Sequence, residues 1–129
     1  MSKEVATIIL NRNVPKVGDR LLRHLKKYDG DISDFYLIEA GSDKDKLSKY
    51  CTWHVSNPSI MKNGLRFPRG MNFGLHQLYK ENKFSRYKAF LLLTNDTGLY
   101  NKPFIKPLYK ELFRHNKLGI ISPCGSDWA

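Results

Sequence analysis

Short apolar segments alternate with segments of helical periodicity along this chain, and this alternation limits the possible folds more than any other feature. Val5 to Leu10 is a continuous apolar and β-branched run, which is typical of a buried strand. Pro15 then suits the first turn of a helix, and apolar side chains recur at helical spacing as far as Tyr28. Strands that alternate with helices in this way predict an α/β fold, with a mainly parallel sheet and helices on both faces.

The rest of the chain continues the same alternation. We predict further strands at 35–38, 51–55, 87–93 and 118–122. We also predict one helix that is capped by Asn72 and a second helix over 104–113. The stretch 56–70 contains two prolines and two glycines, so we predict a loop there.

Length and composition narrow the class of protein. With 129 residues the chain is expected to form a single domain, residues 1–129. It has no apolar stretch of about 18 residues and no recognisable signal peptide, so we expect a cytoplasmic location. The net charge of +10 attracts polyanions, which include nucleic acids, anionic lipid head groups and phosphorylated small molecules. Peripheral contact with an anionic membrane is therefore an expectation as well.

Three polar clusters follow predicted strand ends, at 11–13, 39–43 and 94–97. Right-handed crossovers place all of these strand-to-helix loops at one edge of a parallel sheet, which is where such sheets bind ligands. In the last cluster, Asp96 follows the apolar run 91–93 and has hydroxyl and amide neighbours. Such an acid suits a hard divalent cation that shares its coordination shell with phosphates. The alternative for Asp96 is ordinary turn chemistry.

Two further groups at these loops could contact a ligand. Glu39 ends a predicted strand, so it is either an exposed loop acid or an acceptor for a base N–H or a ribose hydroxyl. Arg66, Arg69 and the helix start at Asn72 form either a solvated basic loop or an anion site built from guanidinium groups and free helix N–H groups.

Four segments carry a resemblance to a known family, and they occur in the family's order over nearly the whole chain. They are Ile-Glu-Ala-Gly-Ser at 38–42, Phe-Pro-Arg-Gly-Met-Asn-Phe-Gly at 67–74, Leu-Thr-Asn-Asp-Thr at 93–97 and Gly-Ile-Ile-Ser-Pro at 119–123. The chain resembles the nucleotide-sugar-binding half of a family 2 glycosyltransferase of the GT-A fold, closest to rhamnosyltransferase-like members. It departs from the family pattern at Glu39, where the family has Asp, and at Thr94, where the first acid of a DxD motif would stand.

The resemblance implies a donor site for a nucleoside diphosphate sugar with Mg²⁺ or Mn²⁺. Asp96 matches the metal ligand, and the positions implied for nucleotide binding are Asn11, Asn13, Glu39, Gly41, Ser42, Arg69, Asn72 and Asn95. The implied reaction is glycosyl transfer to an acceptor hydroxyl of a glycan or a lipid-linked sugar. Family members continue into an acceptor-binding half that carries the catalytic base. We therefore expect a donor-binding domain that is truncated before that half, transfers no sugar by itself and self-associates through exposed apolar surface.

Two other classes of function compete with this interpretation. Basic residues interleaved with Tyr and Phe suit a nucleic-acid-binding α/β module, although that function leaves Glu39 and Asp96 without a purpose. A non-catalytic interaction domain that keeps the fold without the site is the second alternative.

Overall fold

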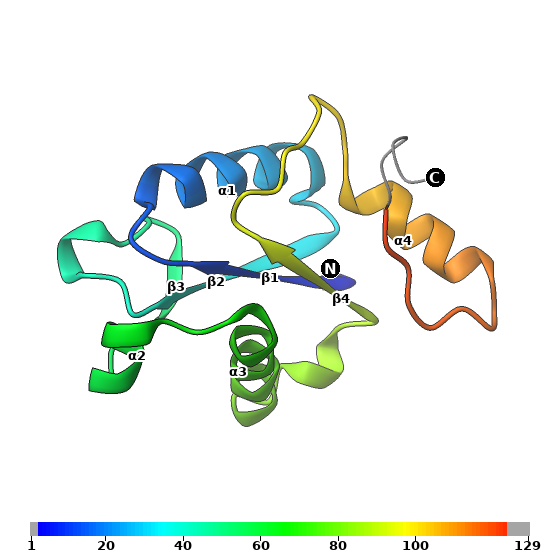
Figure 1. The fold of residues 1–129 in the computed structure, drawn as a ribbon. Helices are drawn as coiled ribbons and strands as arrows, with labels where there is room; N and C mark the ends of the chain where they lie inside the picture. The colour runs from blue at the N-terminus through cyan, green and yellow to red at the C-terminus, as the bar shows by residue number, and fades with distance from the viewer. Residues whose placement is uncertain (1–2, 124–129) are drawn as a thin grey trace, which may run out of the picture.

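Four parallel strands in the order β3-β2-β1-β4 form a sheet at the centre of the molecule (Figure 1). The strands are β1 (Val5–Asn11), β2 (Ser33–Ala40), β3 (Cys51–Val55) and β4 (Ala89–Thr94). The structure is a computed structural model and describes residues 3–123. The predicted α/β fold with a mainly parallel sheet is confirmed, and so is the predicted strand at 51–55.

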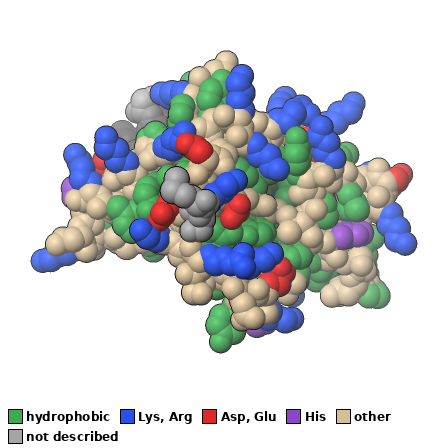
Figure 2. All heavy atoms as spheres, turned by 180° about the vertical axis from the view of Figure 1, so that it is seen from behind, with side chains coloured by type: hydrophobic (Ala, Val, Ile, Leu, Met, Phe, Trp, Pro, Cys, Tyr) green, Lys and Arg blue, Asp and Glu red, His purple; other side chains and the backbone are tan. Residues whose placement is uncertain are grey.

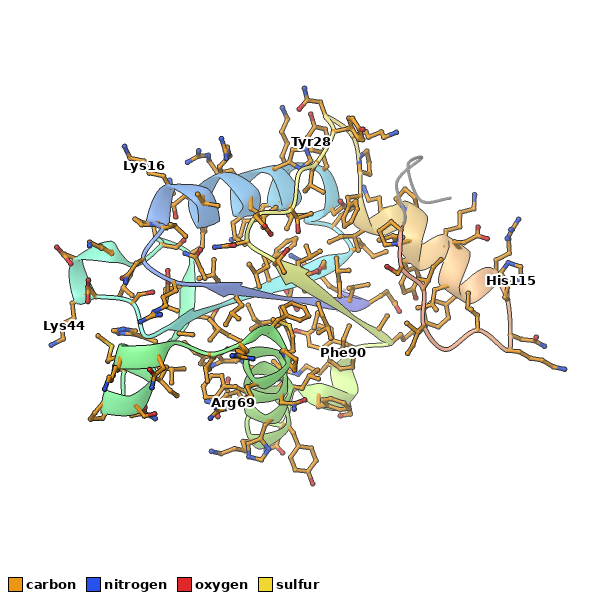
Figure 3. All side chains as sticks on the ribbon, in the orientation of Figure 1. Lys16, Tyr28, Lys44, Arg69, Phe90 and His115 are labelled. Atoms are coloured by element: carbon orange, nitrogen blue, oxygen red, sulfur yellow. The ribbon has the colours of Figure 1, made fainter. Side chains whose placement is uncertain are left out.

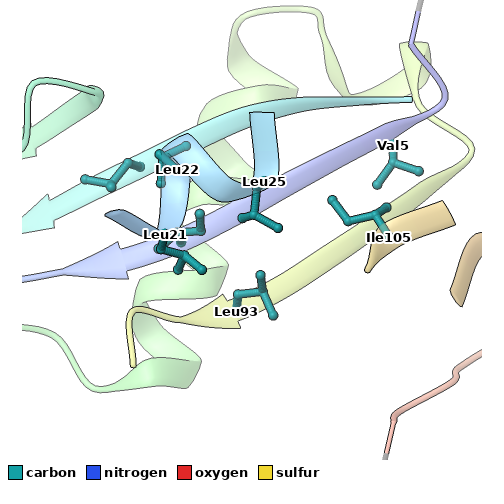
Figure 4. Packing of buried hydrophobic residues seen from close by; sticks show 8 residues of the cluster. Val5, Leu21, Leu22, Leu25, Leu93 and Ile105 are labelled. Atoms are coloured by element: carbon teal, nitrogen blue, oxygen red, sulfur yellow. The ribbon is translucent and has the colours of Figure 1, made fainter. Parts of the chain in front are cut away.

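Helices cover both faces of this sheet, as predicted (Figure 1). On one face lie α1 (Pro15–Asp29) and α4 (Ile105–Arg114), and on the other lies α3 (Phe67–Lys80). Successive residues of a strand point to opposite faces, so Ile9 packs under α1 while Ile8 packs against α3. The buried cluster beneath α1 and α4 contains Val5, Ile9, Leu21, Leu22, Leu25, Leu37, Leu93 and Ile105 (Figure 4).

The predicted loop at 56–70 is wrong, because Pro58, Gly64 and Pro68 mark helix ends and Gly70 lies inside a helix. The short helix α2 (Pro58–Asn63) begins with proline in its first turn, and the Asn57 side chain caps it by accepting a hydrogen bond of 2.9 Å from the Ile60 N–H. Gly64, with φ 69°, ends it. Two 3₁₀ turns, Lys44–Lys46 (η1) and Phe84–Arg86 (η2), complete the described elements.

The predicted helix start at Asn72 is also wrong. Helix α3 begins at Phe67 with proline in its first turn, so Asn72 lies inside the helix with its side chain exposed. Two glycines let this helix approach β1 closely. A Cβ atom on Gly70 would stand 2.7 Å from Leu10 Cδ1, and one on Gly74 would stand 2.8 Å from Ile8 Cγ2.

The predicted strand at 118–122 is absent, since the structure assigns no strand to this described segment. The handedness of the connections gives the physical reason. Crossover connections between parallel strands are right-handed, and the one through α1 leads from β1 to β2. Helix α4 lies on the same face as α1, so a right-handed connection through α4 would lead from β4 in the same direction, toward β1. That side of β4 is already paired with β1.

The buried Asp29 links α1 to α4, a role that sequence analysis missed. Its carboxylate accepts hydrogen bonds from the backbone N–H groups of Phe104 (2.8 Å), Ile105 (3.0 Å) and Lys106 (3.1 Å). Asp29 therefore caps the first turn of α4 from 75 or more positions away in sequence. Within residues 3–123, no helix combines the length and the hydropathy required to cross a bilayer.

Candidate functional site

Hydrogen bonds join the ends of β4, β1 and β2 at the carboxyl edge of the sheet. Asn11, the last residue of β1, is their centre. Its Oδ1 accepts a hydrogen bond of 2.7 Å from Asn95 Nδ2, and its own Nδ2 donates to Glu39 Oε2 at 3.2 Å. The three polar clusters that the sequence places at one edge therefore do come together, and we call this set of residues the Asn11 network.

Glu39 is the most deeply placed member of the Asn11 network, with 0% of its surface exposed. Besides the Asn11 amide, its carboxylate accepts hydrogen bonds from Ser42 Oγ (2.7 Å) and from the Ser48 backbone N–H (2.6 Å). Glu39 is thus not an exposed loop acid, and these bonds give it a positioning role for Asn11 and for the loop after β2. Its predicted contact with a nucleotide base or ribose stays a prediction. Ser48 lies outside the predicted site residues, and no local motif marks it.

The loops after β1 and β2 hold each other in place. Asn13 has φ 55°, its backbone N–H donates to Ser42 Oγ at 3.0 Å, and its Oδ1 accepts from the Asp43 N–H at 2.8 Å. Gly41 has φ 81°, and a Cβ atom there would collide with the carbonyl oxygen of Ile60 in α2. The predicted positions Asn11, Asn13, Glu39, Gly41, Ser42 and Asn95 therefore share one ordered edge.

Asp96 is the second residue after the end of β4 and is exposed. Its turn is held by the Thr97 hydroxyl, which donates to the Thr94 carbonyl oxygen at 2.8 Å. The Asp96 carboxylate has no hydrogen bond or ion pair to any side chain or backbone group of residues 3–123, so it is open to solvent. Among the same residues, no three His, Cys, Asp or Glu side chains are grouped around a common metal position. Asp96 therefore fits a metal only where a ligand's phosphates and water supply the other donor atoms.

The remaining predicted residues lie on the first turns of α3. Arg69 and Asn72 are exposed there (Figure 3 labels Arg69), and within residues 3–123 neither is hydrogen-bonded to the Asn11 network. Gly70 contacts Leu10 near the end of β1, so the start of α3 lies toward the carboxyl edge of the sheet. Arg12 has a structural role that sequence analysis missed, because its guanidinium donates to the carbonyl oxygens of Met61 (2.9 Å) and Lys62 (3.2 Å) at the end of α2.

No protein-family model, no curated protein and no solved structure matches this chain.

Cys51, at the start of β3, provides a probe of this region. Burial raises the pKa of the Cys51 thiol, and the charge of Glu39 raises it further. A raised pKa leaves less thiolate at pH 8, so Cys51 should react with iodoacetamide more slowly in the folded protein than in urea. Rates measured against pH in a Cys124→Ser background should show the folded thiol titrating at the higher pH. Identical profiles for the folded and unfolded chain would contradict this prediction.

Proposed function

We propose that the carboxyl edge of the sheet binds a nucleoside diphosphate sugar together with Mg²⁺ or Mn²⁺. The chain is then a donor-binding domain similar to that of family 2 glycosyltransferases of the GT-A fold. The observation that carries the proposal is the Asn11 network, which joins three strand ends at the edge where parallel α/β sheets bind ligands. Asn11, Glu39 and Ser42 are buried and hydrogen-bonded within the network, so they would shape this edge, while the less buried amides of Asn13 and Asn95 would meet the hydroxyl and base N–H groups of a nucleoside.

The charge of the neighbouring helix start supports a diphosphate as the central part of the ligand. Arg66 and Arg69 are exposed at the N-terminal end of α3, where free backbone N–H groups and the helix dipole also favour an anion. Neither guanidinium has an ion pair within residues 3–123. A guanidinium group can donate two parallel hydrogen bonds to the oxygens of one phosphate, so these two arginines are suited to the diphosphate rather than to the sugar.

Asp96 supports the metal requirement. Mg²⁺ is commonly held by one or two carboxylates plus substrate phosphates, and Asp96 is a solvent-open carboxylate at this edge. When bound, the metal would neutralise charge on the diphosphate leaving group. The chain's own contribution is to hold the loops of this edge in place through the Asn11 network and to bind the diphosphate with Arg66 and Arg69.

The test is a calorimetric titration of the chain with UDP, GDP and dTDP, each with and without Mn²⁺. We expect one nucleotide to bind in a metal-dependent way and to stabilise the fold by about 2.7 kcal/mol at a ligand concentration 100 times Kd. A single-stranded oligonucleotide serves as the control ligand. If none of the three nucleotides binds while the oligonucleotide binds with a steep salt dependence, the nucleic-acid-binding alternative replaces this proposal.

Asp96→Asn should remove the Mn²⁺-dependent gain in nucleotide affinity, at least about tenfold, because an amide is a far weaker ligand for a hard cation. Affinity for the nucleoside without phosphates should hardly change. Asp43→Asn is the matched control, since Asp43 is another exposed acid of these loops and already pairs with Lys46 at 3.6 Å. A mutant that keeps the full metal effect would make Asp96 a turn residue only.

A further inference from the structure

The solvent face of α1 carries an uninterrupted row of positive charge. Lys16, Arg20, Arg23 and Lys27 succeed one another at steps of four, three and four residues, so they lie on one side of the helix. All four are exposed, and none has an ion pair within residues 3–123. Figure 3 shows Lys16 directed away from the sheet at the start of α1. We call these four residues the basic face.

The two acids of α1 form no ion pair with these cations within residues 3–123, because both accept hydrogen bonds from other segments. Asp19 accepts hydrogen bonds from Ser48 Oγ (2.6 Å) and from the Lys49 N–H (3.0 Å), while Asp29 is buried against the start of α4. Like charges three or four residues apart destabilise a helix, and the basic face contains a chain of such pairs. Acids are interspersed among lysines and arginines near the middle of the surface seen in Figure 2. An anionic partner would relieve the repulsion along α1.

The loop between β4 and α4 extends the basic face. The Tyr100 carbonyl oxygen is hydrogen-bonded to His24 Nε2 at 2.6 Å, which brings this loop onto α1. The Tyr100 side chain is 81% exposed, and the Lys102 ammonium lies 5.5 Å from the centre of its ring. An exposed tyrosine beside lysines is a side-chain pair typical of membrane–water interfaces.

We propose that the basic face, together with Tyr100 and Lys102, binds the phosphate head groups of an anionic lipid bilayer, with α1 lying along the membrane surface. The four cations extend over about 17 Å of helix and present their charges to one side, which complements a planar layer of phosphates. This inference goes beyond the proposed donor site and does not depend on it. A single-stranded nucleic acid fits less well, because it requires a groove and free aromatic faces for stacking. The outer side of α1 is convex, and the Lys102 ammonium lies over one face of the Tyr100 ring.

The test is co-sedimentation of the purified chain with vesicles of phosphatidylcholine alone or of phosphatidylcholine with phosphatidylglycerol. The wild-type chain should bind only the anionic vesicles, and less so as salt is raised. The triple variant Arg20→Gln, Arg23→Gln, Lys27→Gln should bind them about 100-fold more weakly, because each Lys or Arg near an anionic bilayer contributes about fivefold. Circular dichroism of the variant should match the wild type, since the replaced side chains are exposed.

The matched control is the triple variant Lys44→Gln, Lys62→Gln, Lys80→Gln. These lysines are exposed, lie on η1, α2 and α3, and have no ion pair within residues 3–123, so the net charge falls by the same amount. The control should lose only a few-fold in vesicle binding, because its charges lie away from α1. An equal loss in both variants, or no binding of wild type to anionic vesicles, would overturn the proposal. It would also be overturned if the basic face were required for binding a labelled oligonucleotide while vesicles did not bind.

Discussion

Asp29→Ala should lower the free energy of unfolding by about 3–5 kcal/mol, the largest effect that we expect from a single substitution in this chain. The Asp29 carboxylate is fully buried and is the acceptor for three backbone N–H groups at the start of α4. Alanine would leave these donors without a partner where water has little access, and α4 would lose its cap. Urea unfolding followed by circular dichroism measures the loss. Amide hydrogen exchange in the 104–114 segment should be faster in the variant, which would show that the loss of stability begins at α4.

Two further variants distinguish the loss of the α4 cap from the mere loss of a negative charge near the start of α4. Asp29→Asn keeps one acceptor oxygen but turns an amide toward the remaining N–H groups, so we expect an intermediate loss of stability. Asp31→Ala removes an exposed acid nearby, which pairs with Lys106 at 2.9 Å, and should change stability little. The capping role would be contradicted if Asp29→Ala had the same free energy of unfolding and the same hydrogen-exchange rates as Asp31→Ala.

Glu39→Ala should cost about 3–4 kcal/mol of folding free energy, because it leaves several buried donors of the Asn11 network without an acceptor. Glu39 accepts from Asn11, Ser42 and Ser48 within a fully buried site. Glu39→Gln should cost less, about 1–2 kcal/mol, since the amide keeps one acceptor oxygen and can donate to the Ser42 hydroxyl. Asp45→Ala, an exposed neighbour in η1, is the control and should leave stability unchanged.

The same Glu39 variants distinguish a positioning role from a direct contact with the nucleotide. If Glu39 contacts the base or ribose, Glu39→Gln should weaken nucleotide binding by about 1–3 kcal/mol even at temperatures where the variant is fully folded. If Glu39 only positions Asn11, the loss of affinity should follow the loss of stability across Glu39→Gln and Glu39→Ala. Unchanged affinity in Glu39→Gln would remove Glu39 from the proposed donor site.

Sequence patterns were misleading where the role of a residue depends on its neighbours in the folded chain. Pro58 and Gly64 suit either a loop or the two ends of a helix, and the Asn57 cap decides for the helix. The apolar run at 118–122 has the composition of a strand, yet its pairing depends on which face α4 occupies. The helix therefore has a local signal in Asn57 and Pro58 that the loop prediction overlooked, whereas the pairing of 118–122 depends on contacts made after the chain has folded.

Periodicity by itself determined the α/β class, the helices 15–29 and 104–113 to within a few residues, and the meeting of three polar strand ends at one edge. It could do so because the period of apolar residues distinguishes strands from helices. Parallel strands joined by right-handed crossovers also have their carboxyl ends at the same edge of the sheet. Only the tertiary structure decided that Asp29 caps α4 and that Glu39 is buried under Asn11 and Ser48 rather than exposed. The sequence does not show whether a carboxylate is hydrated or accepts hydrogen bonds from buried N–H groups. Those N–H groups belong to distant segments that contact the carboxylate only in the folded chain.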